Sequence, residues 1–394
     1  MSTAVSAISL TIPILTALRE VLGPPEPVHP LHVPRFAGNE SRYTQECIDS
    51  TFVSSVGPFV DRFEEELAEV TGAGKVVAVV NGTAALHMAL VLSGVEPGDE
   101  VLVPALTFVA TAAAVRYCGA VPHFVEVEDT TLGMDPAALR EHLRAVAETT
   151  TDGSCRNRRT GRRLRAMVPV HVYGQPCRIE ELAELAAEYG IALVEDAAEA
   201  LGSRLHGRHA GTFAPIGTLS FNGNKTLTTG GGGALLLADE ATARRARHLT
   251  TTAKVPHRWE YDHDELGYNY RMPNLNAALG CAQLEQLPDF LRSKRTLFHR
   301  YREALTGVEG VRLLEERPGT ESNYWLQTLI LDEDRADQRE DLLAATNEAG
   351  YLTRPAWKLM NHLQPYADCP TAPLPVAESL ERRVINLPSS AGLV

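Results

Sequence analysis

The stretch Ser220-Phe221-Asn222-Gly223-Asn224-Lys225-Thr226-Leu227-Thr228-Thr229, followed by four glycines at 230–233, decides how the fold is interpreted. Apolar segments at 216–221 and 234–238 flank it, so we expect the loop to begin and end in the core and a strand to follow the glycines. Glycines let the backbone approach a ligand closely. A lysine held there can lose part of its hydration and form a Schiff base with a carbonyl group. The alternative is a solvated surface lysine, the usual state of a lone lysine in a loop.

A second stretch, Ile191-Ala192-Leu193-Val194-Glu195-Asp196-Ala197-Ala198-Glu199-Ala200, is an apolar run that ends in acidic residues. Its shortness and the helical pattern before it predict a parallel strand of an α/β sheet. Asp196 then lies at the carboxyl end, where open α/β sheets bind ligands. A lysine and a buried aspartate together suit pyridoxal phosphate, whose pyridine nitrogen the aspartate keeps protonated. The alternative for Asp196 is a cap of the following helix.

Five motifs resemble the DegT/DnrJ/EryC1/StrS family of pyridoxal-phosphate sugar aminotransferases. They lie between residues 34 and 388 and comprise Asn81-Gly82-Thr83-Ala84-Ala85-Leu86, Pro104-Ala105-Leu106-Thr107-Phe108-Val109-Ala110-Thr111, Glu195-Asp196-Ala197-Ala198-Glu199-Ala200, the lysine loop, and Gly267-Tyr268-Asn269-Tyr270-Arg271-Met272. Residues 46–63 and 384–390 are similar to the LegC-like branch, which acts on UDP-linked 4-keto sugars. The resemblance implies an α/β fold of type I, with a mostly parallel sheet, helices on both faces and a smaller C-terminal α+β domain.

The order of predicted elements agrees with that fold, because alternating strands and helices at this spacing give a parallel sheet. Strands are expected at 75–80, 100–103, 121–127, 166–172 and 191–196, and helices at 40–49, 60–71, 84–92 and 180–189. A helical pattern is expected from Asn274 to about Thr306, followed by a strand at 323–331 and a helix at 339–348. We expect an N-terminal arm at 1–30, a large cofactor-binding domain at 31–273 and a small domain at 274–394.

Composition excludes several classes of protein. The net charge of −13 argues against a nucleic-acid surface. The six cysteines form no CxxC pair, so we expect reduced thiols in a cytoplasmic protein, with neither disulfides nor a metal site. The N-terminal stretch lacks an early positive charge and is too short to span a membrane. A dinucleotide-binding fold is disfavoured because no GxGxxG follows the first strand.

The turn at 81–83 is a candidate phosphate site, since a small-residue turn entering a helix offers free N–H groups and a positive dipole end. As a bare pattern it is also typical of ordinary α/β turns. The resemblance implies that the cofactor contacts Gly82, Thr83, Phe108, Asp196, Glu199, Ser220 and Lys225, with Phe108 stacked on its ring. It also implies a homodimer with shared active sites, in which Asn269 binds the neighbouring subunit's cofactor phosphate. A core phenylalanine is the alternative for Phe108.

The candidate substrate-binding residues are Ser54, His171, Tyr173, Asn222, Asn224 and Arg271. Alternatives remain: residues 52–60 are typical of a turn before a helix, and a histidine at a strand end is often structural. The basic stretch 149–165 reads as a solvated hairpin or mobile loop, with a role in binding nucleotide phosphates as the weaker alternative. The family usually has an acid where this chain has Gly231, which puts the stiffness of the loop in doubt.

The resemblance implies transfer of an amino group from an amino acid, with glutamate expected, to the 4-keto carbon of a nucleotide sugar. The expected acceptor is a UDP-4-keto-6-deoxy-N-acetylhexosamine. Lys225 would move the substrate proton, first as a base and then as an acid. The alternatives are the same chemistry on a dTDP-linked, GDP-linked or aminoglycoside-type keto sugar, or a non-catalytic regulatory protein of this fold. Related dehydratases carry histidine in place of the lysine, so Lys225 argues against them.

Overall fold

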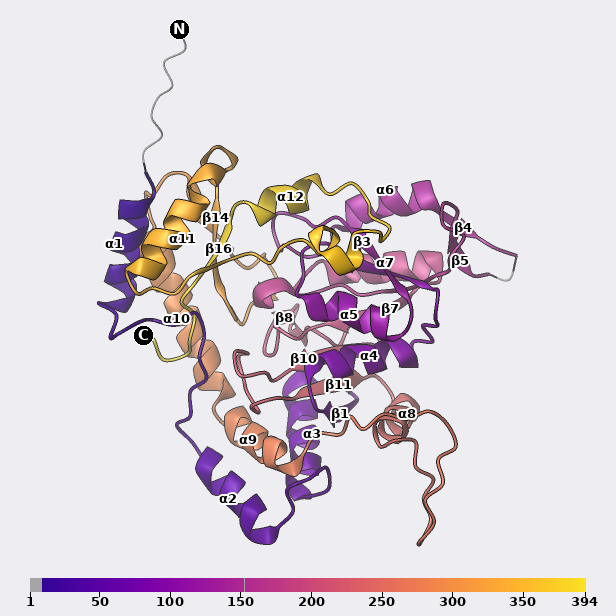
Figure 1. Ribbon diagram of the computed structural model, residues 1–394. Coiled ribbons are helices and arrows are strands. Elements are labelled where there is room, and N and C mark those ends of the chain that lie inside the picture. Colours follow the sequence, from indigo (N-terminus) through magenta and orange to yellow (C-terminus); the bar gives the residue numbers. More distant parts are fainter. Residues whose placement is uncertain (1–8, 152) are drawn as a thin grey trace.

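The computed structural model describes residues 9–151 and 153–394, and a seven-stranded sheet lies at its centre (Figure 1). The strand order is β1-β11-β10-β7-β6-β2-β3. The strands are β1 (Lys75–Val79), β2 (Glu100–Pro104), β3 (Val121–Val125), β6 (Leu164–Met167), β7 (Ala192–Asp196), β10 (Ile216–Ser220) and β11 (Gly233–Leu237). Strand β11 runs antiparallel to both of its neighbours, and the other pairs are parallel. The predicted mostly parallel sheet is therefore confirmed.

Side chains alternate between the two faces of this sheet, so each face can carry helices. On one face Val77 and Val79 lie in a buried cluster with α4 (Gly82–Leu92), α5 (Val109–Tyr117) and α8 (Glu240–Thr250). On the other face Val76 and Ala78 pack with α3 (Pro58–Thr71) and α9 (Asn274–Leu284). Helices α6 (Pro136–Val146) and α7 (Ile179–Tyr189) cover that second face beneath β2, β3, β6 and β7. The expected helix–sheet–helix layering is confirmed.

A second, antiparallel sheet has the order β12-β14-β16-β15, and we call it the small sheet. Its strands are β12 (Val311–Leu313), β14 (Gln327–Leu331), β15 (Arg354–Pro355) and β16 (Val384–Leu387). Helices α1 (Thr11–Leu22), α10 (Leu287–Ala304) and α11 (Arg339–Glu348) share a buried cluster with it. The described part of the predicted N-terminal arm thus packs into the core of the small sheet, and residues 1–8 lie outside the described residues.

The helical pattern predicted from Asn274 to about Thr306 is confirmed, and the chain forms two helices there. Helix α9 ends at Leu284 and α10 begins at Leu287, with Pro288 in its first turn. Proline lacks the N–H that a continuous helix would need at this position. Helix α9 packs with α3 under the large sheet, whereas α10 packs with the small sheet. The domain boundary at residue 273 stays a proposal, with α9 attached to the larger unit.

The remaining elements lie outside these two sheets and their main covering helices. They are α2 (Glu40–Ser50), α12 (Pro375–Glu381), β4 (Ala147–Thr149), β5 (Cys155–Asn157), β8 (Arg204–Leu205), β9 (Arg208–His209) and β13 (Thr320–Glu321), with 3₁₀ turns at Val172–Gly174, Glu333–Gln338, Met360–His362 and Gln364–Tyr366. No helix of the described residues is both long and apolar enough to cross a lipid bilayer.

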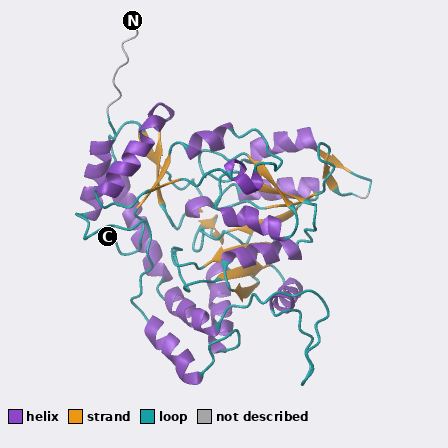
Figure 2. Ribbon diagram, viewed as in Figure 1, coloured by secondary structure: helices purple, strands orange, loops and turns teal. Residues whose placement is uncertain are grey.

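The basic stretch 149–165 contains the hairpin of β4 and β5, which Figure 2 shows at the end of the molecule remote from the small sheet. Asn157 and Thr160 donate hydrogen bonds to the buried carboxylate of Glu100, at 2.9 and 2.5 Å. The hairpin therefore has a fixed anchor on β2. It precedes β6, so it lies beside the amino ends of the parallel strands, at the edge opposite Asp196. This position gives no support to a role in binding the substrate's phosphates.

Candidate active site

The carboxyl ends of β1, β7 and β10 meet at one edge of the large sheet, because these strands all run in the same direction. Asp196 ends β7 and Ser220 ends β10, and Asn81 comes just after β1. Thr218 of β10 is in register with Asp196, and Val170 forms a bridge to Asp196 on the other side. Ligands bind at such an edge in open α/β sheets.

A helix N-terminus lies against the end of β10. The Asn81 side chain accepts a hydrogen bond from the Ala84 N–H at 2.7 Å and caps α4, which begins at Gly82. A Cβ atom on Gly82 would lie 2.8 Å from the Ser220 Cβ, and one on Gly233 would lie 2.5 Å from the Asn81 carbonyl carbon. Glycine at both positions therefore permits the close approach. The first N–H groups of a helix lack intrahelical partners, and with the Ser220 hydroxyl they form a suitable anion cradle.

Lys225 projects from the loop after β10 and contacts two groups. Its Nζ lies 3.2 Å from Oε1 of Glu199 and 3.9 Å from the centre of the Trp325 ring. The side chain is 12% exposed, so one side of the amine remains open to the cavity described below. The lysine is largely but not fully enclosed, as expected for a loop that begins and ends in the core.

Two buried carboxylates lie beside this lysine. Burial raises the pKa of Asp196, while hydrogen bonds from the Thr111 hydroxyl (2.8 Å) and the Ala198 N–H (3.1 Å) act in the opposite direction. Burial also raises the pKa of Glu199, against the attraction of Lys225 and a hydrogen bond from the Tyr173 N–H. Both groups thus gain from a positive charge placed in the cavity, because such a charge offsets their lost hydration.

These groups line a cavity of about 370 Å³. Nine residues of the sequence prediction line it: Gly82, Thr83, Phe108, Asp196, Glu199, Ser220, Asn222, Asn224 and Lys225. Five further lining residues with polar or aromatic side chains were not predicted as site residues: Asn81, Thr107, Thr111, Trp325 and Trp357. Phe108 is about half exposed and lies 6.2 Å from the Trp357 ring, so it is a cavity wall and not a core residue.

His171 and Tyr173 do not line this cavity, so their prediction as substrate-binding residues needs correction. His171 is fully buried, with Nε2 3.0 Å from Glu195 and Nδ1 accepting the Cys177 N–H. Burial opposes its charge, yet contacts with Cys177 and Glu195 raise the pKa of His171 to about 10. Tyr173 is buried in a 3₁₀ turn with φ of 54°, and its ring packs on Trp357 at 4.8 Å. His171 acts as a structural histidine, and Tyr173 supports the cavity wall from behind.

Arg271 is also placed in the interior, which corrects its prediction as a substrate ligand. Its guanidinium donates to Glu64 at 2.8 Å and to the Ala78 carbonyl at 3.1 Å, and both charged side chains are 7% exposed. It therefore ties the segment after residue 269 to α3 and β1, away from the cavity.

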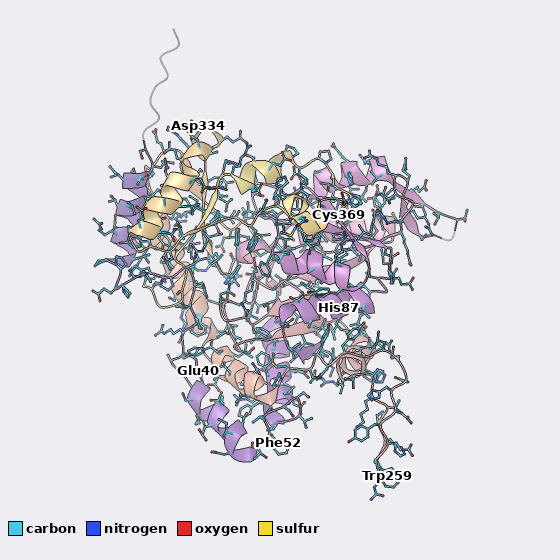
Figure 3. The ribbon with its side chains drawn as sticks, viewed as in Figure 1. Glu40, Phe52, His87, Trp259, Asp334 and Cys369 are labelled. Atoms are coloured by element: carbon cyan, nitrogen blue, oxygen red, sulfur yellow. The ribbon has the colours of Figure 1, made fainter. Side chains whose placement is uncertain are left out.

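Ser54 and Asn269 lie on the surface and outside the cavity of their own chain. The Ser54 carbonyl accepts the Asn274 N–H at 2.6 Å, which ends the turn before α3. Asn269 belongs to the long loop after α8, whose tip carries Trp259 and stands away from the body (Figure 3). One chain alone thus does not bring these two residues to the site.

The residues of the cavity fit pyridoxal phosphate. The helix N-terminus and the Ser220 hydroxyl suit a phosphate, the buried Asp196 carboxylate suits a protonated ring nitrogen, and the Lys225 amine suits an aldehyde. Gly82 and Gly233 let the α4 N-terminus and the Ser220 hydroxyl lie close enough to form one cradle, since an added Cβ atom at either position would collide with Ser220 or Asn81.

Comparison with known proteins identifies the family. The model of the DegT/DnrJ/EryC1/StrS aminotransferase family matches residues 34–394. The chain is 40% identical to the putative pyridoxal phosphate-dependent aminotransferase EpsN of Bacillus subtilis, over 92% of this chain and 91% of EpsN. It is 36% identical to the GDP-perosamine synthase of Vibrio cholerae, over 92% and 94%.

A solved structure agrees with these sequence matches. The aminotransferase TlmJ of Streptoalloteichus hindustanus superposes with a TM-score of 0.82 at 30% identity, covering 92% of this chain and 93% of TlmJ. The predicted fold of pyridoxal-phosphate aminotransferases is thereby confirmed. The chain belongs to the DegT/DnrJ/EryC1/StrS aminotransferase family, whose aminotransferases depend on pyridoxal phosphate.

Proposed function

We propose that this protein transfers an amino group from glutamate to the 4-keto carbon of a UDP-linked 6-deoxy-N-acetylhexosamine. The observation that carries the proposal is the meeting of Lys225, Asp196 and the α4 N-terminus in one cavity. Family membership supports the amino transfer, and the GDP-perosamine synthase among the relatives supports a nucleotide-linked sugar as acceptor. We place the reaction in the cytoplasm, which suits six free cysteines.

Bound pyridoxal phosphate supplies an electron sink that lets an amino group pass from one carbonyl carbon to another. Asp196 holds the proton on the pyridine nitrogen, which keeps the sink effective. The Nζ of Lys225 would take the proton from the substrate carbon as a base and would then, as an acid, deliver it to the aldehyde carbon of the bound cofactor. Gly82, Thr83 and Ser220 hold the phosphate, and Phe108 orients the ring by stacking.

The cavity lacks the cations that these substrates need. Among the described residues that line it, Lys225 is the single cation, and it faces the two acids Asp196 and Glu199. A nucleotide sugar brings a diphosphate and glutamate brings two carboxylates, which favour arginine or lysine partners. We infer that a second copy of the chain supplies them.

The long loop after α8 has the composition for that role. Lys254, His257 and Arg258 lie in it beside Trp259 and Tyr261, whose side chains are 68% and 77% exposed. Exposed aromatic residues of this size are typical of interfaces. We propose a homodimer in which this loop enters the partner's cavity and Asn269 binds the partner's cofactor phosphate. Asn222 and Asn224 would contact the sugar bound in the cavity of their own chain. The exposed Ser54 would reach the substrate only in the same dimer.

The acceptor is tested by direct competition between nucleotides. The purified holoenzyme receives glutamate with a UDP-linked or a GDP-linked 4-keto sugar, and the amino sugar is measured by mass spectrometry. We expect the higher kcat/KM with the UDP sugar, since residues 46–63 and 384–390 resemble a UDP-specific branch. A higher value with the GDP sugar would overturn the nucleotide assignment and favour the function of the perosamine-synthase relative. Amination of neither sugar would refute the proposed acceptor class.

The shared site is tested by mixing two inactive variants after reversible dissociation. In a heterodimer of Lys225→Ala and Asn269→Ala chains, one site carries both lesions and the other carries neither. Activity should therefore rise above that of either variant alone. As a matched control, Lys225→Ala mixed with Asp196→Ala should recover nothing, because each lesion disables its own chain's site. Proven heterodimers without recovery would show that Asn269 acts within its own chain.

A further inference from the structure

The segment before β14 reaches from the small sheet into the active site. Trp325 is buried and lines the cavity, and its indole N–H donates to the Asn224 carbonyl at 2.6 Å. The face of the same ring meets the Nζ of Lys225 at 3.9 Å from the ring centre. One side chain thus contacts both the lysine and the backbone of the residue before it.

Asn323 holds this segment against the same loop. Its Nδ2 donates to the carbonyls of Glu199 (2.8 Å) and Leu201 (2.9 Å) and to the Thr226 hydroxyl (3.3 Å). Its Oδ1 accepts the Trp325 N–H at 2.8 Å. Trp325 and Asn323 therefore bind the loop on both sides of Lys225, at residues 224 and 226.

Trp325 is also fixed from its carbonyl side by Lys294. This lysine of α10 is fully buried, and its Nζ donates to the Trp325 carbonyl at 3.1 Å and to the Ser389 carbonyl at 2.7 Å. The third contact of Nζ is Nε2 of His32, at 2.7 Å. Well-packed side chains held at several points keep a single orientation, which an active site requires of the residues that aim a catalytic group.

We propose that Trp325 is a positioning residue, whose ring holds the free ammonium of Lys225 against Glu199 while its indole N–H fixes the lysine loop. The proposal rests on the catalytic role proposed for Lys225. Whenever the amine is not bonded to the cofactor, the aromatic face and the carboxylate give it one resting position. A lysine amine over the face of a tryptophan ring is attracted to that ring, which favours this position.

The test measures the amine itself, in the cofactor-free protein. Reductive methylation with formaldehyde and cyanoborohydride modifies a lysine amine more slowly when neighbouring groups hold that amine, and peptide mass spectrometry gives the rate at each lysine. Lys75, which is exposed and distant, serves as the internal standard. Trp325→Leu should methylate Lys225 roughly two- to thirtyfold faster than the wild type, the range expected when a cation–π contact is lost. Trp325→Phe keeps a ring and loses the N–H donor, so its rate should be intermediate.

Trp357→Leu is the matched control, since it opens the same cavity without removing a contact of Lys225. The methylation rate of Lys225 in Trp357→Leu should equal that of the wild type. An increase as large as that in Trp325→Leu would show that the rate reports only access to the cavity, and it would overturn the proposal. A wild-type rate in Trp325→Leu would also overturn it. If that variant does not fold, Trp325→Phe decides, because it removes the indole N–H bond to Asn224 and a Lys225 rate equal to that of the wild type would then overturn the proposal. Amino transfer that survives in Lys225→Ala would instead refute the catalytic role proposed for Lys225, and the methylation rates do not depend on that result.

Discussion

Arg271→Ala offers a sharp test of the structure, because the sequence motif and the fold give this residue different roles. The Arg271 guanidinium pairs with Glu64 inside the protein, and both side chains are 7% exposed. Removing one partner of a buried pair leaves the other charge without full compensation. The variant should therefore lose stability and keep the affinity of the folded enzyme for its acceptor.

The size of the stability loss in Arg271→Ala depends on the partners that Glu64 keeps. Breaking a buried ion pair costs about 3–5 kcal/mol in the free energy of unfolding. In the variant Glu64 still accepts the Ala78 N–H at 2.8 Å and Arg247 at 2.7 Å. We therefore expect the free energy of unfolding to fall by an amount near the lower end of that range, about 3 kcal/mol.

The assay is urea unfolding followed by circular dichroism, with acceptor KM measured on the folded protein. Arg247→Ala is the matched control, because Arg247 binds the same carboxylate with a side chain that is 47% exposed. Solvent screens such a pair, so its loss should cost about 1 kcal/mol or less. An unchanged urea midpoint in Arg271→Ala, together with a raised acceptor KM, would refute the interior role and restore the substrate role predicted from the sequence.

Three further predictions concern the buried acids, the buried histidine and the anion cradle. The pKa of His171 is raised to about 10 in the folded protein, from about 6.5 when unfolded, so its contribution to stability is complete below pH 6.5 and is lost as pH rises toward 10. The urea midpoints measured at pH 6.5 and at pH 9.5 should therefore differ more in the wild type than in His171→Gln. Equal differences in the two proteins would contradict this. Asp196→Asn keeps the shape and removes the charge, so kcat should fall roughly 10²- to 10³-fold while the cofactor stays bound; unchanged turnover would exclude the proposed role. Gly82→Ala places a Cβ 2.8 Å from the Ser220 Cβ and should therefore weaken cofactor binding, measured by titrating the apoprotein with pyridoxal phosphate. An unaltered affinity would mean that the phosphate cradle lies elsewhere.

The sheet could be predicted from the sequence because its strands are short, continuous apolar runs between turn signals. Asp196 and Lys225 could be found for a related reason: Asp196 ends one such run and Lys225 lies in the loop after another, and parallel strands bring their carboxyl ends together. The break between α9 and α10 could not be read with the same ease, since apolar residues recur on both sides of it. Pro288 was the available signal, and it lies in the first turn of α10, where proline is tolerated.

The direction of individual side chains was the part that the sequence left undetermined. His171 lies near the end of a strand, and the neighbouring turn with Tyr173 at φ 54° sends the chain away from the cavity. Arg271 lies two residues after Asn269 but turns to a carboxylate on α3. Trp325 was missed because its partner Asn224 lies 101 positions earlier, and that contact arises only when the small sheet packs on the large one. A tryptophan next to polar residues just before an apolar strand was the available signal.

The most direct test of the central claim is the absorbance of the bound cofactor in the wild type and in Lys225→Ala, followed by turnover of the same samples. Glutamate should shift the visible band of the wild type, and a UDP-linked 4-keto sugar should reverse the shift as the amino sugar forms. In folded Lys225→Ala both changes should slow by about 10²- to 10⁴-fold, since the group that moves the substrate proton is gone. Turnover of Lys225→Ala at the wild-type rate would contradict the assignment of Lys225 as the catalytic amine.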